Sequence, residues 1–537
     1  MFDVVIIGGG HNGLVCAAYL AGGGLKVCVM EAHDTVGGAA ITEEFHPGFR
    51  NSVAAYTVSL LNPKVIRDLD LANHGLKIVE RPMQNFLPLP DGRSLAVGPA
   101  RTRDEVAKFS ARDADRLATY QARLQAVADL IRDLALTTPP NLTRGDGAAF
   151  IREAIKAGRL ARRLGRLGIA GERDLLQLFT GSAGDFLDSW FESDPIKAVL
   201  GFDAIVGHYA SPYAPGTAYV LLHHAFGEVN GKRGQWGHAI GGMGAITQAM
   251  AAAATARGVE IRTSEPVREV IIENGRAGGV ITAGGEGIRA RAVVSAINPK
   301  LLFTRLVDEA AVPEDFRERM RSYRLGSGTF RMNVALSELP DFTAAPGCEP
   351  ADHHTAGIII APSLAYMERA WCDARATGWA REPVIELVIP SVLDDSLAPK
   401  GAHVASLFCQ HVAPALPGNR SWDAHKDDVA DLMIATVETY APNFRRAVIG
   451  RQVLSPDDLE RRFGMMGGDI FHGVMDSGQL FSARPVLGHA DYRAPVPGLY
   501  LTGAGTHPGG GVTGAPGHNA AREVLKDFRR RRVPAGA

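Results

Sequence analysis

The stretch Val4-Val5-Ile6-Ile7-Gly8-Gly9-Gly10-His11-Asn12-Gly13 decides the fold of this chain. Its first four residues are apolar and β-branched, which is typical of a parallel strand covered by helices on both faces. Residues 8–13 then fit the pattern G-x-G-x-x-G, and residues 14–20 are mostly small and apolar, as in a closely packed helix. Strand, glycine turn and helix in this order predict the start of a dinucleotide-binding βαβ unit.

Three glycines of this turn have separate expected roles. Gly8 permits the tight turn, Gly10 lets a pyrophosphate approach the backbone, and Gly13 lets the helix lie close to the strand. We expect the phosphates at the helix N-terminus, beside His11 and Asn12. There the unpaired N–H groups and the positive end of the helix dipole stabilise negative charge without a basic side chain.

A second apolar strand is predicted at 26–30, and it ends at Glu31-Ala32, with Glu31 18 residues beyond Gly13. A carboxylate at this place binds ribose hydroxyls, which favours FAD or NAD over NADP. Gly37-Gly38-Ala39 then brings more backbone without bulky side chains towards the same phosphates, and this favours FAD. The alternatives are a solvated glutamate and an ordinary Gly-Gly turn.

The size and charge of the chain limit its function. A chain of 537 residues is expected to form two connected domains, and a net charge of −1 provides no general attraction to nucleic acid or acidic membranes. We therefore expect no nucleic-acid partner. No apolar run approaches the roughly 18 residues that span a bilayer, and a core strand begins at Val4 with no leader before it, which predicts a cytoplasmic protein.

The cysteines and histidines do not predict a disulfide centre or a metal site. The five cysteines include no C-x-x-C pair, so buried free thiols are the expected state. His353, His354, His403 and His411 lack a clear metal-ligand spacing. We predict no bound metal.

Between about residues 102 and 207 the pattern changes to long helices, which predicts an inserted helical domain or lid. Residues 151–167 carry five arginines and a lysine among Ile and Leu, which indicates a basic amphipathic helix. The favoured interpretation is a solvated face or a subunit contact. The alternative is peripheral contact with an anionic membrane, where a water-insoluble substrate would be collected.

Later segments return to the pattern of the nucleotide domain. Gly241-Gly242-Met243-Gly244 opens a helix, but no clear apolar strand precedes it, so it is a poor candidate for a second dinucleotide site. Asn274-Gly275 predicts a hairpin inside residues 267–288, and backbone at Val267 is expected to contact adenine. Alternating strands within 299–456 predict a sheet that shapes a substrate chamber.

The carboxyl-terminal part predicts another strand, glycine turn and helix. Residues 498–505 end in Gly503-Ala504-Gly505, and residues 506–514 include Gly511-Val512-Thr513. We expect the backbone here to present N–H groups to the ribityl chain and the N1–C2=O edge of a flavin.

The segment from Tyr500 to Ala521 resembles the C-terminal FAD motif of the phytoene desaturase family of carotenoid enzymes. Residues 463–473 and Arg484-Pro485 are most similar to the branch called pyridine nucleotide-disulfide oxidoreductase domain-containing protein 2. The resemblance identifies no acid or base. It implies roles in holding FAD for Gly8, Gly10, Gly13, Glu31, Gly38, Val267, Gly505 and Val512.

The predicted fold class is α/β, with a Rossmann-type FAD-binding domain and a discontinuous α+β substrate domain with a helical lid. Residues 1–101, 230–298 and 457–537 are assigned to the FAD-binding domain. Residues 102–229 and 299–456 are assigned to the substrate domain, with its helical insertion.

The leading functional hypothesis is hydride removal by FAD from a C–H bond of an apolar, polyene- or lipid-like substrate, giving or isomerising a double bond. Oxygen, quinone or another protein is the expected electron acceptor. The alternatives are an amine or amino-acid oxidase and a non-catalytic partner-binding protein stabilised by FAD. The side chains considered for the apolar chamber are Tyr56, Tyr209, Tyr213, His223, His472 and His507.

Overall fold

Strand β1 (Phe2–Ile7) lies inside a mixed sheet, between two parallel neighbours, in the computed structural model, which describes residues 1–143 and 147–530. Helix α1 (His11–Gly22) follows the glycine turn and leads to β2 (Val27–Met30), which pairs in parallel with β1. The predicted βαβ unit is confirmed. The other described strands of this sheet are β11 (Glu260–Arg262), β12 (Val267–Glu273), β13 (Arg276–Thr282), β14 (Gly287–Ser295) and β20 (Leu499–Leu501).

The apolar run of β1 is continuous because both of its faces are covered. Val4 and Ile6 point to the face where α1, α10 (Met243–Thr255) and α17 (Ala515–Arg529) pack together. Val5 and Ile7 point to the opposite face, which the β12–β13 hairpin and residues 302–323 cover. This two-sided burial is the reason that the strand shows no polar alternation.

The predicted hairpin is present between β12 and β13. Asn274 and Gly275 both have positive φ, at 51° and 71°, which is the backbone conformation of a two-residue type I′ turn. Strand β14 then pairs with β13 through its first residues and with β1 through its last ones. The hairpin thus joins the edge of the parallel sheet.

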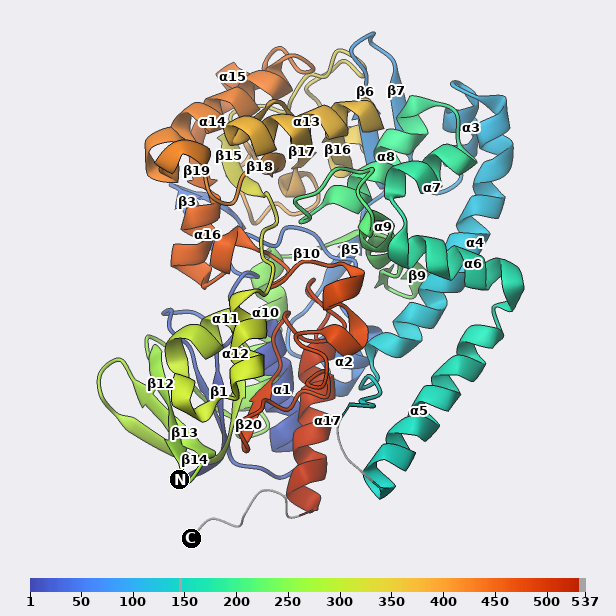
Figure 1. The fold of residues 1–537 in the computed structure, drawn as a ribbon. Coiled ribbons are helices and arrows are strands. Elements are labelled where there is room, and N and C mark those ends of the chain that lie inside the picture. The colour runs from blue at the N-terminus through green and yellow to red at the C-terminus, as the bar shows by residue number, and fades with distance from the viewer. Residues whose placement is uncertain (144–146, 531–537) are drawn as a thin grey trace.

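A second sheet provides the wall that faces the nucleotide domain, in the upper part of Figure 1. In β16, Ile358 and Ile360 pack towards α14 (Trp422–Glu438), whereas Ile359 packs towards the helical region. In spatial order, its described strands are β19 (Val448–Leu454), β15 (Phe330–Leu336), β18 (His403–Val412), β17 (Trp379–Val388), β16 (Gly357–Ile360), β6 (Asn85–Pro88) and β7 (Ser94–Val97).

The predicted helical insertion follows β7 and lies to one side of both sheets in Figure 1. Its α4 helix, predicted from the periodicity of residues 113–136, extends along the molecule. The helices are α3 (Thr102–Ala107), α4 (Ala111–Ala135), α5 (Ala148–Gly165), α6 (Gly168–Thr180), α7 (Ala183–Trp190), α8 (Asp194–Ile205) and α9 (Thr217–Ala225).

One part of the predicted domain division needs correction. The first segment, 1–101, was assigned to the FAD-binding domain, but β6 and β7 within it pair with β16 and belong to the second sheet. The partner strand lies far along the chain, so nothing local in residues 85–97 indicates this pairing. Within the described residues, no helix is both long and apolar enough to cross a membrane.

Candidate cofactor and substrate site

A cavity of about 800 Å³ extends from the carboxyl ends of β1 and β2 to strands β17 and β18 of the second sheet. This volume is within the usual range for cofactor and ligand sites, and ligands of such sheets bind at the carboxyl ends of the strands. Fourteen predicted FAD-contacting residues line the cavity. They are Gly8, Gly10, His11, Asn12, Gly13, Glu31, Ala32, Gly37, Gly38, Ala39, Val267, Ala504, Gly511 and Val512.

The glycine turn shows two different requirements. A Cβ atom on Gly13 would lie 2.1 Å from the carbonyl oxygen of Gly8, so no side chain fits between helix and turn. A Cβ atom added to Gly10 would have no heavy atom of the described chain within 4 Å. The φ angle of this residue is −69°, which any residue can adopt. Gly10 is therefore not required by the protein's own packing. It leaves space for a ligand.

Glu31 is held in a defined place at the cavity wall. Its side chain is only 5% exposed, and its carboxylate accepts hydrogen bonds from the backbone N–H groups of Gly9 at 2.7 Å and His33 at 3.0 Å. The alternative of a freely solvated glutamate is therefore wrong. These bonds fix the carboxylate beside the turn, at the end of β2.

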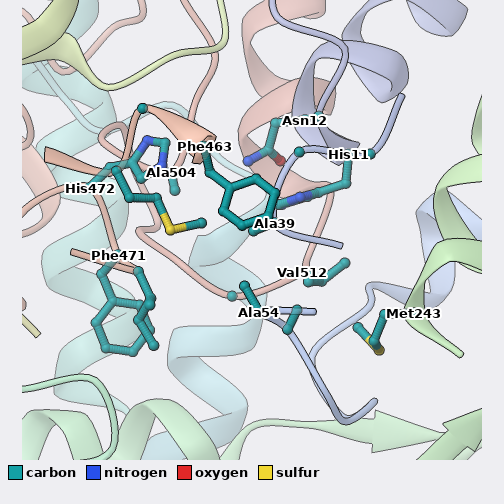
Figure 2. A pocket seen from close by; sticks show the side chains of 18 of the residues that line it. His11, Asn12, Ala39, Ala54, Met243, Phe463, Phe471, His472, Ala504 and Val512 are labelled. Atoms are coloured by element: carbon teal, nitrogen blue, oxygen red, sulfur yellow. The ribbon is translucent and has the colours of Figure 1, made fainter. Parts of the chain in front are cut away.

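Several polar atoms around the cavity lack a partner, as expected for a site built for a polar cofactor. His11 Nε2, Asn12 Oδ1 and His472 Nδ1 are buried, and no described residue forms a hydrogen bond with them. Buried polar atoms normally have partners. In Figure 2, His11 and Asn12 lie on one side of the pocket and His472 lies on another. The phosphates and hydroxyls of FAD match this set of unsatisfied groups, so FAD fits the site.

Burial also determines the charge of the two histidines. Loss of hydration lowers the pKa of His11 to about 4 and that of His472 to about 4. Both rings are thus neutral near pH 7. Positive charge for bound phosphates would come from the backbone at the start of α1, where no acidic side chain lies in the first turn.

Contrary to expectation, Gly503, Gly505 and Thr513 do not line the cavity. A Cβ on Gly503 would lie 2.6 Å from Ala296 O, and one on Gly505 would lie 2.4 Å from Pro299 Cδ. These glycines allow close packing behind the site. The Thr513 hydroxyl accepts the N–H of Ala515, the first residue of α17.

The turn at 241–244, which the sequence marks as a poor second dinucleotide site, uses its N–H groups internally. Gly241 N donates to Asp394 Oδ2 at 2.7 Å, Met243 N donates to Ser52 Oγ, and Gly244 N donates to Thr42 Oγ1. These N–H groups are not free to bind phosphate. The turn instead anchors α10 against neighbouring segments.

The two segments that resemble one family branch form a single hydrogen-bonded unit next to the cavity. The buried guanidinium of Arg484 donates to the carbonyl oxygens of Phe471, Gly473, Val474, Gln479 and Ala504. The buried carboxylate of Asp469 accepts N–H groups of Gly326, Phe471 and Gly473. This unit positions Phe471, His472 and Ala504 at the wall.

The part of the cavity beyond the glycine turn is mainly apolar and aromatic. Its wall comes from α8 and α9, from the second sheet and from the loop after α16 (Pro456–Phe463). Such a chamber excludes water from a reacting substrate. Its apolar and aromatic lining residues include Phe202, Val206, Trp236, Phe408, Ile470 and Phe471.

Two acids, which sequence reasoning missed, lie in this mainly apolar wall: Asp203 on α8 and Glu386 on β17. Burial raises the pKa of Asp203 to about 8, and the nearby Glu386 raises it as well. Glu386 accepts a hydrogen bond from the Tyr56 hydroxyl. Each acid stands alone in an apolar run of sequence, and this is the signal that could have identified it.

Two buried arginines, Arg81 and Arg331, act electrostatically on Glu386. The guanidinium of Arg331 lies 4.5 Å from the centre of the Tyr56 ring and donates to Leu407 O and Ser406 Oγ. Arg81, also buried, donates to Thr57 Oγ1. The pKa of Glu386 is raised above its usual value, because burial has the largest effect. The attraction of Arg81, the bond from Tyr56 and the attraction of Arg331 offset only part of this rise.

Of the six side chains considered for the chamber, Tyr56 and His472 line it. The other four do not. Tyr213 is 38% exposed and bonds to Asp188, and His507 bonds to Leu134 O. His223 bonds to Gly510 O behind the wall, and Tyr209 packs against Gly328.

Replacing Asp203 with asparagine is expected to change how stability depends on pH. The pKa of Asp203 is about 8 in the folded chain, compared with roughly 4 when unfolded, so the native state holds the extra proton. The wild type therefore loses stability as pH rises between these values, and the variant lacks this loss. The free energy of unfolding in urea at pH 5 and pH 8 tests this. Parallel pH dependence in both proteins would contradict it.

Comparison with known proteins places the chain among flavoproteins. The family described as flavin containing amine oxidoreductase matches residues 13–329. The "pyridine nucleotide-disulfide oxidoreductase domain-containing protein 2" of Rattus norvegicus is 42% identical, over 98% of this chain and 94% of the rat protein. A lycopene-forming phytoene desaturase of Pseudescherichia vulneris is 26% identical, over 96% of each chain.

A solved structure gives the same result for the fold. A triple mutant of putrescine oxidase superposes with a TM-score of 0.60 at 17% identity, over 99% of each chain. At this identity the likeness shows the fold alone. It agrees with the predicted Rossmann-type domain joined to a substrate domain.

Proposed function

Since this chain belongs to the flavin containing amine oxidoreductase family and is an FAD-dependent oxidoreductase, we propose that it desaturates or isomerises an apolar, polyene- or lipid-like substrate. The comparisons also confirm the predicted resemblance to phytoene desaturase-like proteins and to the named branch. The observation that carries the proposal is one cavity that joins the glycine turn to an apolar and aromatic chamber.

The chain's own residues have distinct tasks in this proposal. The turn at Gly10 and the carboxylate of Glu31 would hold the dinucleotide, and Gly511 and Val512 line the same cavity. Bound FAD supplies the acceptor for a hydride from carbon. Phe408 and Phe471 exclude water and orient an apolar chain by shape.

Asp203 is the group in the chamber best suited to take the proton that desaturation releases. With a pKa of about 8, only a minor fraction of Asp203 is ionised at pH 7; this fraction can accept a proton, and it grows as the pH rises towards 8. Glu386 is a weaker candidate because its carboxylate already accepts a hydrogen bond from Tyr56 and is stabilised by the positive charges of Arg81 and Arg331. Asp203→Asn should therefore remove one ionisation from the pH profile of substrate oxidation.

Amine oxidation is the second candidate, and the same two acids favour it. A carboxylate in an apolar wall could pair with the ammonium group of a substrate. The high pKa of Asp203 argues against this, because a neutral carboxyl group attracts a cation weakly. The 26% identity to a phytoene desaturase also favours an apolar substrate.

Anaerobic titration of the flavin absorption distinguishes the substrate classes. Polyene and terpenoid hydrocarbons, primary amines and NADPH are added separately to the purified holoprotein. Bleaching by the apolar class alone is expected. Bleaching by amines alone would replace the proposal with the second candidate, and bleaching by NADPH alone would point to a nicotinamide-dependent reaction. Oxygen, quinones and an acceptor protein are then compared as oxidants of the bleached protein.

A further inference from the structure

Helix α5 differs from the other long helices because it has little contact with the rest of the molecule. Among its described side chains none is buried, and α6 is its main packing partner. Figure 1 shows it as the outermost helix of this region, standing apart from the body of the protein. A helix of this length gains most of its stability from packing one face. Its outer face is therefore a candidate for an external partner.

Large apolar side chains are exposed mainly in this region. Ten are exposed in the described chain, and six of them lie between residues 142 and 176. Single exposed apolar residues are normal, but a cluster indicates a contact surface. The six residues are Leu142 (48%), Phe150 (46%), Ile151 (59%), Ile155 (50%), Ile169 (71%) and Leu176 (65%).

The exposed side of α5 has two adjoining stripes. Ile151, Ala154, Ile155 and Gly158 follow one another at helical spacing and form an apolar stripe. A basic stripe lies beside it, at 152, 159, 163 and 166. Both are exposed. Apolar residues bordered by long cationic side chains are typical of a helix that lies in a membrane interface.

The charge of the region is strongly positive in a chain of net charge −1. Residues 148–176 contain seven Lys and Arg against three Asp and Glu. Two of these acids are already paired, Glu153 with Lys156 and Asp174 with Arg123. Within 1–143 and 147–530, no carboxylate forms an ion pair with an arginine of the basic stripe. These cations remain available for an anionic partner.

We propose that the outer face of α5, extended by Ile169 and Leu176 of α6, docks on an anionic lipid surface. A lipid headgroup layer provides negative charge above an apolar interior, which matches the two stripes. A second copy of the chain fits less well, because a symmetric contact would place the same cations opposite each other. The helix lies on the surface, since no described helix can span it. This proposal does not depend on the substrate.

Vesicle sedimentation tests the docking, with the holoprotein and vesicles of phosphatidylcholine alone or mixed with phosphatidylserine. Wild type is expected to sediment with the anionic vesicles, and 0.5 M salt should weaken this strongly. Arg159→Gln/Arg163→Gln should weaken partitioning roughly 30-fold, since each cation contributes about a factor of five. Ile151→Asp/Ile155→Asp should abolish it.

Matched controls make the test specific. Ile449 and Leu487 are exposed to similar extents, 49% and 58%, but lie outside this region. Ile449→Asp/Leu487→Asp should therefore bind vesicles as wild type does. Each variant must keep the wild-type melting temperature and FAD content.

Three results would overturn the proposal. The first is absence of binding to anionic vesicles, and the second is equal loss in the α5 and control variants. The third is a wild-type protein that binds no vesicles but forms a concentration-dependent dimer, measured by light scattering, which Ile151→Asp/Ile155→Asp disrupts. That result would assign the face to a second copy of the chain.

Discussion

Replacing Gly10 with valine should abolish FAD binding while the apoprotein stays folded. Within the described chain, an added Cβ at this position meets no heavy atom within 4 Å, and the backbone conformation suits any residue. The new side chain would occupy the space into which the pyrophosphate must fit. We expect a loss of affinity of at least about 100-fold, equivalent to roughly 3 kcal/mol. Flavin content after purification and FAD titration of the apoprotein measure it.

Two neighbouring glycines separate loss of the cofactor from loss of the fold. Gly13→Ala would bring Cβ to 2.1 Å from Gly8 O, so this variant should lose thermal stability as well as FAD. Gly22→Ala, at the end of the same helix, has 3.9 Å to its nearest atom and should change neither. If Gly10→Val retained FAD at wild-type affinity, the assignment of this turn to the pyrophosphate would be wrong.

Replacing Arg484 with methionine should cause the largest loss of stability. Its guanidinium is fully buried and donates to the carbonyl oxygens of five residues, including Phe471 and Ala504 at the cavity. Methionine would leave these carbonyls without donors. We expect the free energy of unfolding to fall by about 3–5 kcal/mol, measured with urea, and FAD to bind more weakly.

Arg381 provides the control for this substitution. Its side chain is 81% exposed and pairs with Asp373 at 2.8 Å, so Arg381→Met should cost less than about 1 kcal/mol. Arg484→Lys should lie between the two, because an ammonium group keeps the charge but cannot reach all five acceptors. Equal effects of Arg484→Met and Arg381→Met would contradict the role of Arg484 in holding the wall.

The sequence predicted those features whose physical cause is local. The turn around Gly10, the strand that ends at Glu31 and the hairpin at Asn274-Gly275 each depend on neighbouring residues, and the structure contains them. The hairpin β6–β7 was assigned to the wrong domain because its pairing with β16 joins distant parts of the chain. Local patterns carry no information about such pairing.

The substrate chamber was predicted less well than the nucleotide turn, for the same reason. Asp203 and Glu386 lie in one wall only after a helix and a strand from separate segments pack together. Residue type alone is a poor guide to the chamber, because Tyr213, an expected lining residue, lies at the surface. A single acid inside an apolar run, as at Asp203, is a better guide, because burying an acid is costly unless it has a function or a partner.

We infer that the glycine turn, Glu31 and the unsatisfied polar atoms of His11, Asn12 and His472 form an FAD site. The most direct test is the absorption spectrum of the purified protein before and after saturation with FAD. The flavin released on denaturation is then quantified. We predict an oxidised-flavin spectrum and one FAD per chain. A folded protein that contains no flavin and does not bind added FAD would contradict the claim.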